Sequence, residues 1–114
     1  MRDARSFLTS RLTMTEPSAF EIVNAAGASP FVLTCEHASN YMPARYAALG
    51  LPAHELQRHI AWDIGAAALS RTLARLLDAP LILSGYSRLL IDCNRPLHSP
   101  TLMPRISETT EIPG

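Results

Sequence analysis

The chain has 114 residues, of which 47% are hydrophobic and 18% are charged. This composition fits one globular domain with a modest core and excludes a disordered polypeptide. Ten basic residues balance ten acidic ones, so the overall charge indicates neither nucleic acid nor an anionic membrane as a partner. No apolar run reaches the roughly 18 residues of a membrane span, and the N-terminus lacks the apolar stretch of a secretory signal. We therefore expect a cytoplasmic protein with a small-molecule partner.

The first segment, residues 1–29, mixes Arg, Ser, Thr, Ala and Pro without a sustained hydrophobic period. The letters GASP at its end are a loop signal. We expect an irregular segment here, followed by one domain over residues 30–114. Met14 follows a basic, Ser/Thr-containing stretch, so the sequence leaves open whether translation begins at Met1 or at Met14.

The first apolar run, PFVLTCEH, predicts a strand that ends in residues able to do chemistry. Its Phe31, Val32 and Leu33 are typical of a strand buried on both faces, as in parallel sheets. Open α/β folds bind their ligands beyond the carboxyl ends of such strands. The letters CEH therefore mark the first candidate site.

Helical segments are expected after this strand. Pro43, Gly50 and Pro52 predict a loop with a helical turn over residues 44–49 and a short helix from about Ala53. The strongest helical signal covers residues 64–78, with Asp63 placed to cap its N-terminus. There Arg71 and Arg75 lie opposite an apolar stripe, which consists of Leu69, Leu73, Leu76 and Leu77.

Beyond Pro80, the letters LILSG and SRLLIDCN predict two short strands, with GYS as the turn between them. The last 20 residues hold four prolines without a hydrophobic period, so we expect an irregular tail. The order strand, helix, strand favours a parallel βαβ crossover and an α/β fold.

Two cysteines and two histidines receive a structural interpretation. Cys35 and Cys93 are too few for a disulfide framework or a four-cysteine zinc site, so we expect two reduced, buried side chains. The letters HELQRH resemble the zinc helix H-E-x-x-H, yet His54 and His59 are five residues apart instead of four. On a helix they would point about 140° apart and would not share a metal.

His37 is the first candidate for a metal site. It follows a buried strand, where its backbone is fixed while its ring can enter a cleft, and a neutral imidazole nitrogen binds Zn²⁺. A hydrogen-bonded structural histidine remains the alternative. Glu36 points to the opposite face if the strand stays regular, so we interpret it as a salt-bridge or loop-anchoring residue. Asp63 has two open interpretations, the helix cap and a second metal ligand.

Polar residues also follow the strand predicted at SRLLIDCN. Arg88, Asn94 and Arg95 could bind a small dicarboxylate, because the guanidinium group accommodates a carboxylate with two hydrogen bonds and Asn adds a donor. The alternative is an internal pair of Arg88 or Arg95 with Asp92.

Four motifs, CEHASN, WDIGA, SRLLIDCNR and EIPG, in this order and spacing, resemble the N-formylglutamate amidohydrolase family. The resemblance covers about residues 30–114, the N-terminal part of the family's domain, so we expect a truncated or fragmentary chain. It implies a three-layer α/β sheet with flanking helices, like that of zinc-dependent exopeptidases. It also implies hydrolysis of N-formyl-L-glutamate to formate and glutamate, a step of histidine breakdown in bacteria.

The resemblance further implies roles for single residues. His37 and Asp63 match metal ligands, and Asn94 and Arg95, with Arg88 as a weaker companion, match residues that hold a substrate carboxylate. The implied cofactor is zinc, with its third ligand and the catalytic carboxylate expected outside this chain. Ala38-Ser39-Asn40 replace a Ser-Gly found in other members, which widens the expected substrate to other N-acyl amino acids. A non-catalytic module that binds an acidic metabolite through Arg95 is the alternative, and no motif specifies an oligomeric state.

Overall fold

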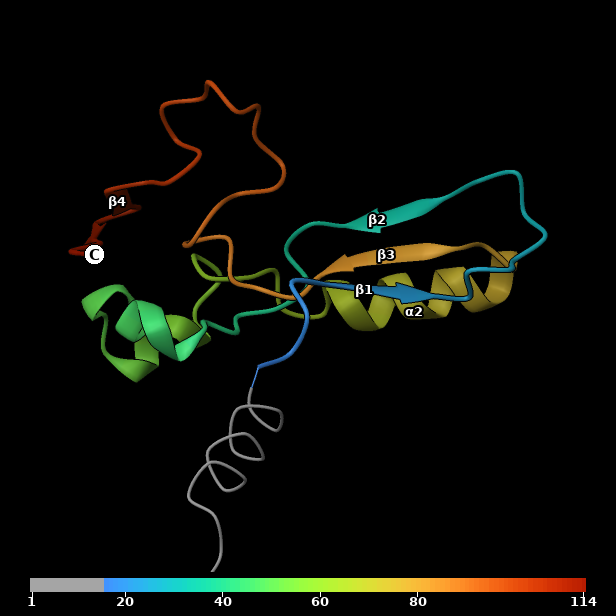
Figure 1. Ribbon diagram of the computed structural model, residues 1–114, viewed down its shortest axis with the longest axis horizontal. Helices are drawn as coiled ribbons and strands as arrows, with labels where there is room; N and C mark the ends of the chain where they lie inside the picture. The colour runs from blue at the N-terminus through green and yellow to red at the C-terminus, as the bar shows by residue number, and fades with distance from the viewer. Residues whose placement is uncertain (1–15) are drawn as a thin grey trace, which may run out of the picture.

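The computed structural model describes residues 16–114, so Met1 and Met14 lie outside the described part. The described chain is a small mixed α/β structure, shown in Figure 1. Its elements are β1 (Phe20–Val23), β2 (Leu33–Cys35), the 3-10 helices η1 (Ala44–Gly50) and η2 (Ala53–Gln57), α2 (Ala66–Leu77), β3 (Leu81–Ser84), β4 (Ile106–Ser107) and β5 (Thr110–Glu111). None of the helices in this part of the chain is long and apolar enough to cross a membrane.

The main sheet has three strands in the order β1-β3-β2. β2 and β3 are parallel, with Thr34 opposite Ile82, and α2 connects them in the chain, which confirms the predicted βαβ unit. β1 joins the other edge of β3 in the antiparallel direction, with Ile22 opposite Ile82. The strand β1 lies in the segment that we expected to be irregular.

The core lies between the sheet and α2, which runs along one face of it (Figure 1). Leu81 and Leu83 of β3 are 0% and 2% exposed and pack with Cys35 and Ala74. The other face is uncovered within residues 16–114. Ile82 is 40% exposed, and Phe31 and Val32 are also exposed, so the prediction of a strand buried on both faces was wrong.

Helix α2 differs from the prediction in its start and in its buried face. It begins after Gly65, whose φ of 86° is the left-handed conformation that glycine adopts without strain. Asp63 makes no capping hydrogen bond to it, since no side chain caps this end. The buried face is formed by alanines such as Ala74, which let the helix approach the sheet closely. The leucine stripe is exposed instead, at Leu69, Leu73, Leu76 and Leu77.

The segment predicted as a strand at SRLLIDCN forms turns. Its backbone hydrogen bonds go to loops, because Ser87 N donates to Tyr41 O and Arg88 N to Ala61 O. Leu89 fills a second apolar cluster with Leu51, Ile60, Ala61 and Ile112. Cys93 in this segment is exposed, which corrects the expectation of two buried cysteines, whereas Cys35 is buried as predicted.

The C-terminal tail is more ordered than expected. β4 and β5 form a short antiparallel hairpin, and Glu108 at its turn pairs with His59 at 2.6 Å and with Arg58 at 3.1 Å. His54 pairs with Glu55, so the two histidines of HELQRH contact different carboxylates. These contacts fasten the hairpin to the segment after η2.

A pair of alanine substitutions tests which face of the sheet is buried. Leu83→Ala should lower the free energy of unfolding by about 2–5 kcal/mol, because it opens a cavity beneath α2. Ile82→Ala, one residue away on the uncovered face, should cost less than half as much. Urea denaturation of both variants measures this, and equal losses would contradict the assignment of faces.

Candidate functional site

The candidate site lies at the carboxyl ends of the parallel strands β2 and β3. In Figure 1 the arrowheads of both strands point toward the side of the molecule that carries η1, η2 and the C-terminal hairpin. Three segments meet there, namely the loop after β2 with His37, the turn before α2 with Asp63, and residues 88–95 after β3. The sheet edge predicted from the sequence is therefore the one that gathers polar side chains.

Main-chain hydrogen bonds hold these segments in register. Asp63 N donates to His37 O at 2.9 Å, which joins the first two segments directly. The third segment is fixed through Ala61, whose carbonyl accepts from Ser87 Oγ at 2.8 Å and from Arg88 N at 3.2 Å. The positions of the functional side chains are thus set by backbone contacts between loops, which a single sequence does not reveal.

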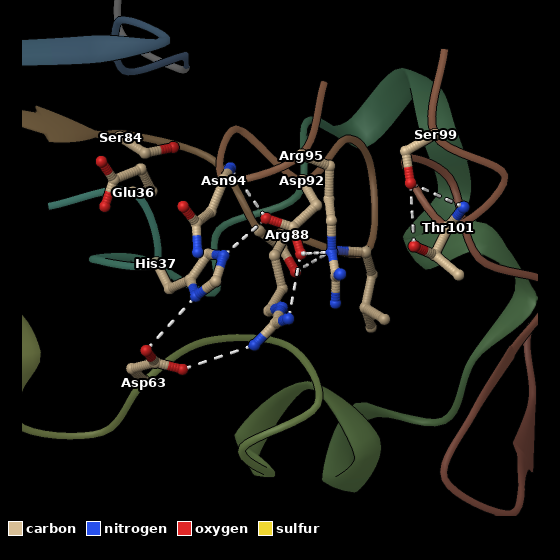
Figure 2. Close-up of polar contacts among 12 residues, drawn as sticks. Glu36, His37, Asp63, Ser84, Arg88, Asp92, Asn94, Arg95, Ser99 and Thr101 are labelled. Carbon is tan, nitrogen blue, oxygen red and sulfur yellow. Dashed lines mark hydrogen bonds and ion pairs between the residues drawn. The ribbon is translucent and has the colours of Figure 1, made fainter. Parts of the chain in front are cut away.

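The imidazole of His37 lies between two carboxylates, as Figure 2 shows. Its Nδ1 is 3.2 Å from Asp63 Oδ2, and its Nε2 is 2.6 Å from Asp92 Oδ1. The side chains of His37 and Asp92 are 9% and 4% exposed, whereas that of Asp63 is 53% exposed. One side of the ring is therefore anchored in the interior and the other faces an accessible carboxylate.

Asp92 is the most heavily contacted carboxylate of the site. Burial opposes its ionisation, but the hydrogen bonds from His37 and from Asn94 N, together with the charge of Arg88, outweigh burial and hold the pKa of Asp92 below its ordinary value. The Asn94 amide lies 3.0 Å from Oδ1. Asp92 is consequently an ionised acceptor inside the site.

The arginines differ in how they meet these acids. Arg88 bridges two of them, with Nη2 donating to Asp92 Oδ2 at 2.9 Å and Nη1 3.5 Å from Asp63 Oδ1. Arg95 reaches Asp92 only through Nε at 3.7 Å, and its side chain is 46% exposed. A cavity of about 160 Å³ lies beside both arginines, with Thr101 and Glu108 also in its wall. Arg95 is thus the arginine with more freedom to meet a ligand.

The structure brings together the residues that the sequence singled out. His37 and Asp63 are in contact, Arg88 contacts Asp63, and Arg95 joins the group through Asp92, as does the backbone of Asn94. Asp92 was considered only as a partner for arginine, and its contact with His37 was missed. The sequence signal that could have drawn attention to Asp92 is its place in the letters IDCNR, two residues before the Asn-Arg pair.

As a metal site the group is incomplete within residues 16–114, where no three His, Cys, Asp or Glu side chains are arranged to hold an ion. The pair His37 and Asp63 nevertheless fits two corners of a zinc site. Ligand atoms about 2.0–2.2 Å from a tetrahedral zinc lie about 3.3 Å from each other. The observed separation of Nδ1 and Oδ2 is 3.2 Å.

The sequence model of the N-formylglutamate amidohydrolase family matches residues 29–114. The chain belongs to this family. A family of amidohydrolases supports a hydrolytic role in general, and its match includes all of the site residues described above. A comparison with curated proteins gave no match.

A similar solved structure is the crystal structure of gene product Atu2144 from Agrobacterium tumefaciens. The present member of the N-formylglutamate amidohydrolase family is 45% identical to it in sequence, and the two structures agree with a TM-score of 0.82. The alignment covers 85% of this chain and 38% of that chain. The present chain thus spans about two fifths of the length of that relative.

The charge of Arg88 makes a testable contribution to the ionisation of Asp92. In Arg88→Gln the pKa of Asp92 should rise, because a cation that favours the ionised carboxylate is removed. An acid with a lowered pKa stabilises the fold above its unfolded-state pKa, and this stability is lost as pH falls through the folded-state pKa. In Arg88→Gln the stability that Asp92 loses on acidification should therefore be smaller, and the loss should be complete at a higher pH, because the folded-state pKa lies closer to the unfolded-state pKa.

Carboxyl ¹³C NMR titration of the chain measures this shift directly. Asp78 is the internal control, because its pKa is lowered by Asn24 and by the Ala28 amide, away from Arg88. An unchanged pKa of Asp92 in the variant would contradict the bridge seen in the structure.

Proposed function

We propose that this chain contributes the metal-holding and carboxylate-binding residues of a metal-dependent amide hydrolase. Its substrate is N-formyl-L-glutamate or a related N-acyl amino acid, and its products from the former are formate and glutamate. The single observation behind this proposal is the contact of His37 with Asp63 at the strand ends, beside two arginines. Membership of the N-formylglutamate amidohydrolase family supports the reaction class.

The proposed metal is zinc, held by Nδ1 of His37 and by the carboxylate of Asp63. Imidazole nitrogen and carboxylate oxygen are ordinary zinc ligands, and the 3.2 Å between them suits a tetrahedral site. Bound zinc would polarise the amide carbonyl and lower the pKa of a water molecule. Catalytic zinc sites have three protein ligands, so the proposal assigns the third to a part of the protein outside residues 16–114.

The proposed role of the arginines is to orient the substrate through its carboxylates. Arg95 is half-exposed and only loosely paired, so its planar guanidinium group can donate two hydrogen bonds to a carboxylate. Arg88 already pairs with Asp63 and Asp92, and it adds positive charge beside the cavity of about 160 Å³ that both arginines line. Asn94 would supply an additional donor. A substrate held at this point presents its amide toward His37 and Asp63.

In this proposal the reaction takes place in the bacterial cytoplasm, where release of glutamate from its N-formyl derivative is a step of histidine breakdown. Ala38 and Ser39 line a separate cavity of about 450 Å³ between β1 and the start of α2. In this proposal the cavity would receive an acyl group larger than formyl, because Ala38 and Ser39 directly follow His37 in the chain.

A second candidate function is a non-catalytic module that binds an acidic metabolite through Arg95. The observation in its favour is that Arg95 is exposed and loosely paired while the described residues present only two metal ligands in contact. Such a module binds glutamate or its N-acyl derivatives without zinc, whereas the hydrolase requires the metal for turnover.

Zinc binding tests the metal part of the proposal. The 114-residue chain should take up about one zinc ion in competition with a chromophoric chelator. His37→Gln and Asp63→Asn should each weaken its affinity at least tenfold, because each removes a ligand. His59→Gln is the matched control, since His59 also pairs with a carboxylate but lies outside the site. Equal affinity in all four proteins would contradict the assignment of the ligands.

Removal of the Arg95 side chain tests the carboxylate site. Arg95→Ala should weaken binding of N-formyl-L-glutamate about 10–100-fold, the loss expected for a charged pair of hydrogen bonds. Arg75→Ala, at an exposed position on α2, should leave it unchanged. Isothermal titration calorimetry with and without zinc measures both variants. Binding that needs no zinc favours the module, and binding unaffected by Arg95→Ala contradicts both functions.

A further inference from the structure

We infer that Asp92 is the positioning residue of His37. It holds the ring with the proton on Nε2, so that Nδ1 is the nitrogen presented to Asp63 and to a metal. The orientation of the ring follows from contacts in the chain, and only its use in metal binding rests on the proposed function. Asp92 acts through His37 and has no contact with substrate in this role.

The contact between the two residues is short and buried. Nε2 of His37 lies 2.6 Å from Oδ1 of Asp92, and both side chains are more than nine-tenths buried. A hydrogen bond in such surroundings is stronger than one in water. Rotation of the ring would break this bond and leave a carboxylate unpaired in the interior, which is costly.

The partners of Asp92 determine where the ring proton lies. Its carboxylate accepts a hydrogen bond from the Asn94 backbone amide at 3.0 Å and another from an Arg88 N–H at 2.9 Å. These contacts stabilise the ionised carboxylate, which can only accept. A nitrogen 2.6 Å away must therefore donate, so Nε2 of His37 carries a proton.

The other ring nitrogen of His37, Nδ1, also faces a carboxylate oxygen. Nδ1 of His37 and Oδ2 of Asp63 are 3.2 Å apart. A neutral ring protonated at Nε2 has a lone pair on Nδ1, and a lone pair and a carboxylate oxygen repel each other unless a cation lies between them. A proton or a metal ion satisfies this requirement. Because Asp92 fixes the ring, exchange of one cation for the other needs no reorientation of His37.

Arg88 gives the arrangement a second support. Its guanidinium group bridges Asp92 and Asp63 at 2.9 and 3.5 Å, so the acids on the two sides of the ring are also held by one cation. Histidines that bind metals commonly donate their other ring N–H to a carboxylate, and loss of that carboxylate lowers metal affinity about 10–100-fold. The position of Asp92 matches this role.

The protein contains a matched control for this contact. His59 and Glu108 are also 2.6 Å apart, but their side chains are 64% and 52% exposed. Exposed ion pairs contribute little. Glu108→Gln therefore removes a carboxylate at the same distance from a histidine without touching the buried pair.

Long-range ¹H–¹⁵N NMR of the ¹⁵N-labelled chain tests the orientation of the ring. The four histidines are distinguished with a His37→Gln variant. In the wild type, Nε2 of His37 should carry a proton with a strongly downfield shift, and added zinc should change the shift of Nδ1 while the Nε2 proton stays. Zinc binding at Nε2, or a ring protonated only on Nδ1, would overturn the inference without the need for any variant.

The affinity for zinc tests the contribution of Asp92. Asp92→Asn keeps the shape of the side chain but loses its charge, so the downfield Nε2 proton should disappear and zinc should bind about 10–100-fold more weakly. Glu108→Gln should retain both wild-type properties. Circular dichroism checks that the variants are folded, and if Asp92→Asn does not fold, the wild-type spectrum decides which nitrogen binds zinc.

The outcomes separate this inference from the proposed function. If the wild type binds no zinc at His37 while the Nε2 proton depends on Asp92, the proposed metal site fails and the positioning role stands. If zinc binds through His37 with the same affinity in Asp92→Asn, the positioning role fails and the metal site stands.

Discussion

The buried carboxylate of Asp92 is the constraint on which the arrangement of the site depends. It accepts hydrogen bonds from His37, Arg88 and the backbone of Asn94, and so it joins the end of β2 to the segment after β3. A carboxylate that is almost fully buried is tolerated only when its oxygens are paired. Pairing of Asp92 therefore requires that these two segments lie together. The half-exposed Asp63 and Arg95 lie at the accessible edge of the site.

Local patterns predicted the elements of the fold better than their packing. The helix over α2 and the strand β3 followed from hydrophobic period and from Pro80, and the parallel pairing of β2 with β3 followed from their order. The period alone did not show which face of α2 is buried. The leucine stripe is exposed and the alanines face the sheet, because the small alanine side chains let the helix approach the strands closely.

The sequence singled out residues that the structure places together, but it did not predict the contacts among them. Predicted strand ends and the start of the helix singled out His37, Asp63, Asn94 and Arg95, the resemblance gave these residues their expected roles, and the structure gathers them at one edge. The strand expected at SRLLIDCN is a series of turns because Ser87 and Arg88 bond to loops. Those turns place Asp92 against His37, 55 residues away in the chain. A contact at such a distance in sequence depends on the tertiary fold, so the place of Asp92 beside the Asn-Arg pair could draw attention to the residue but could not show that its partner is His37.

The gap between His37 and Asp63 is the proposed metal position. The most direct test is anomalous X-ray diffraction at the zinc absorption edge from crystals of the chain grown with zinc. We expect an anomalous peak about 2.0–2.2 Å from both His37 Nδ1 and an oxygen of Asp63, with Asp92 still hydrogen-bonded to Nε2. A peak elsewhere, such as beside His54 or His59, with the gap between His37 and Asp63 empty, would contradict it.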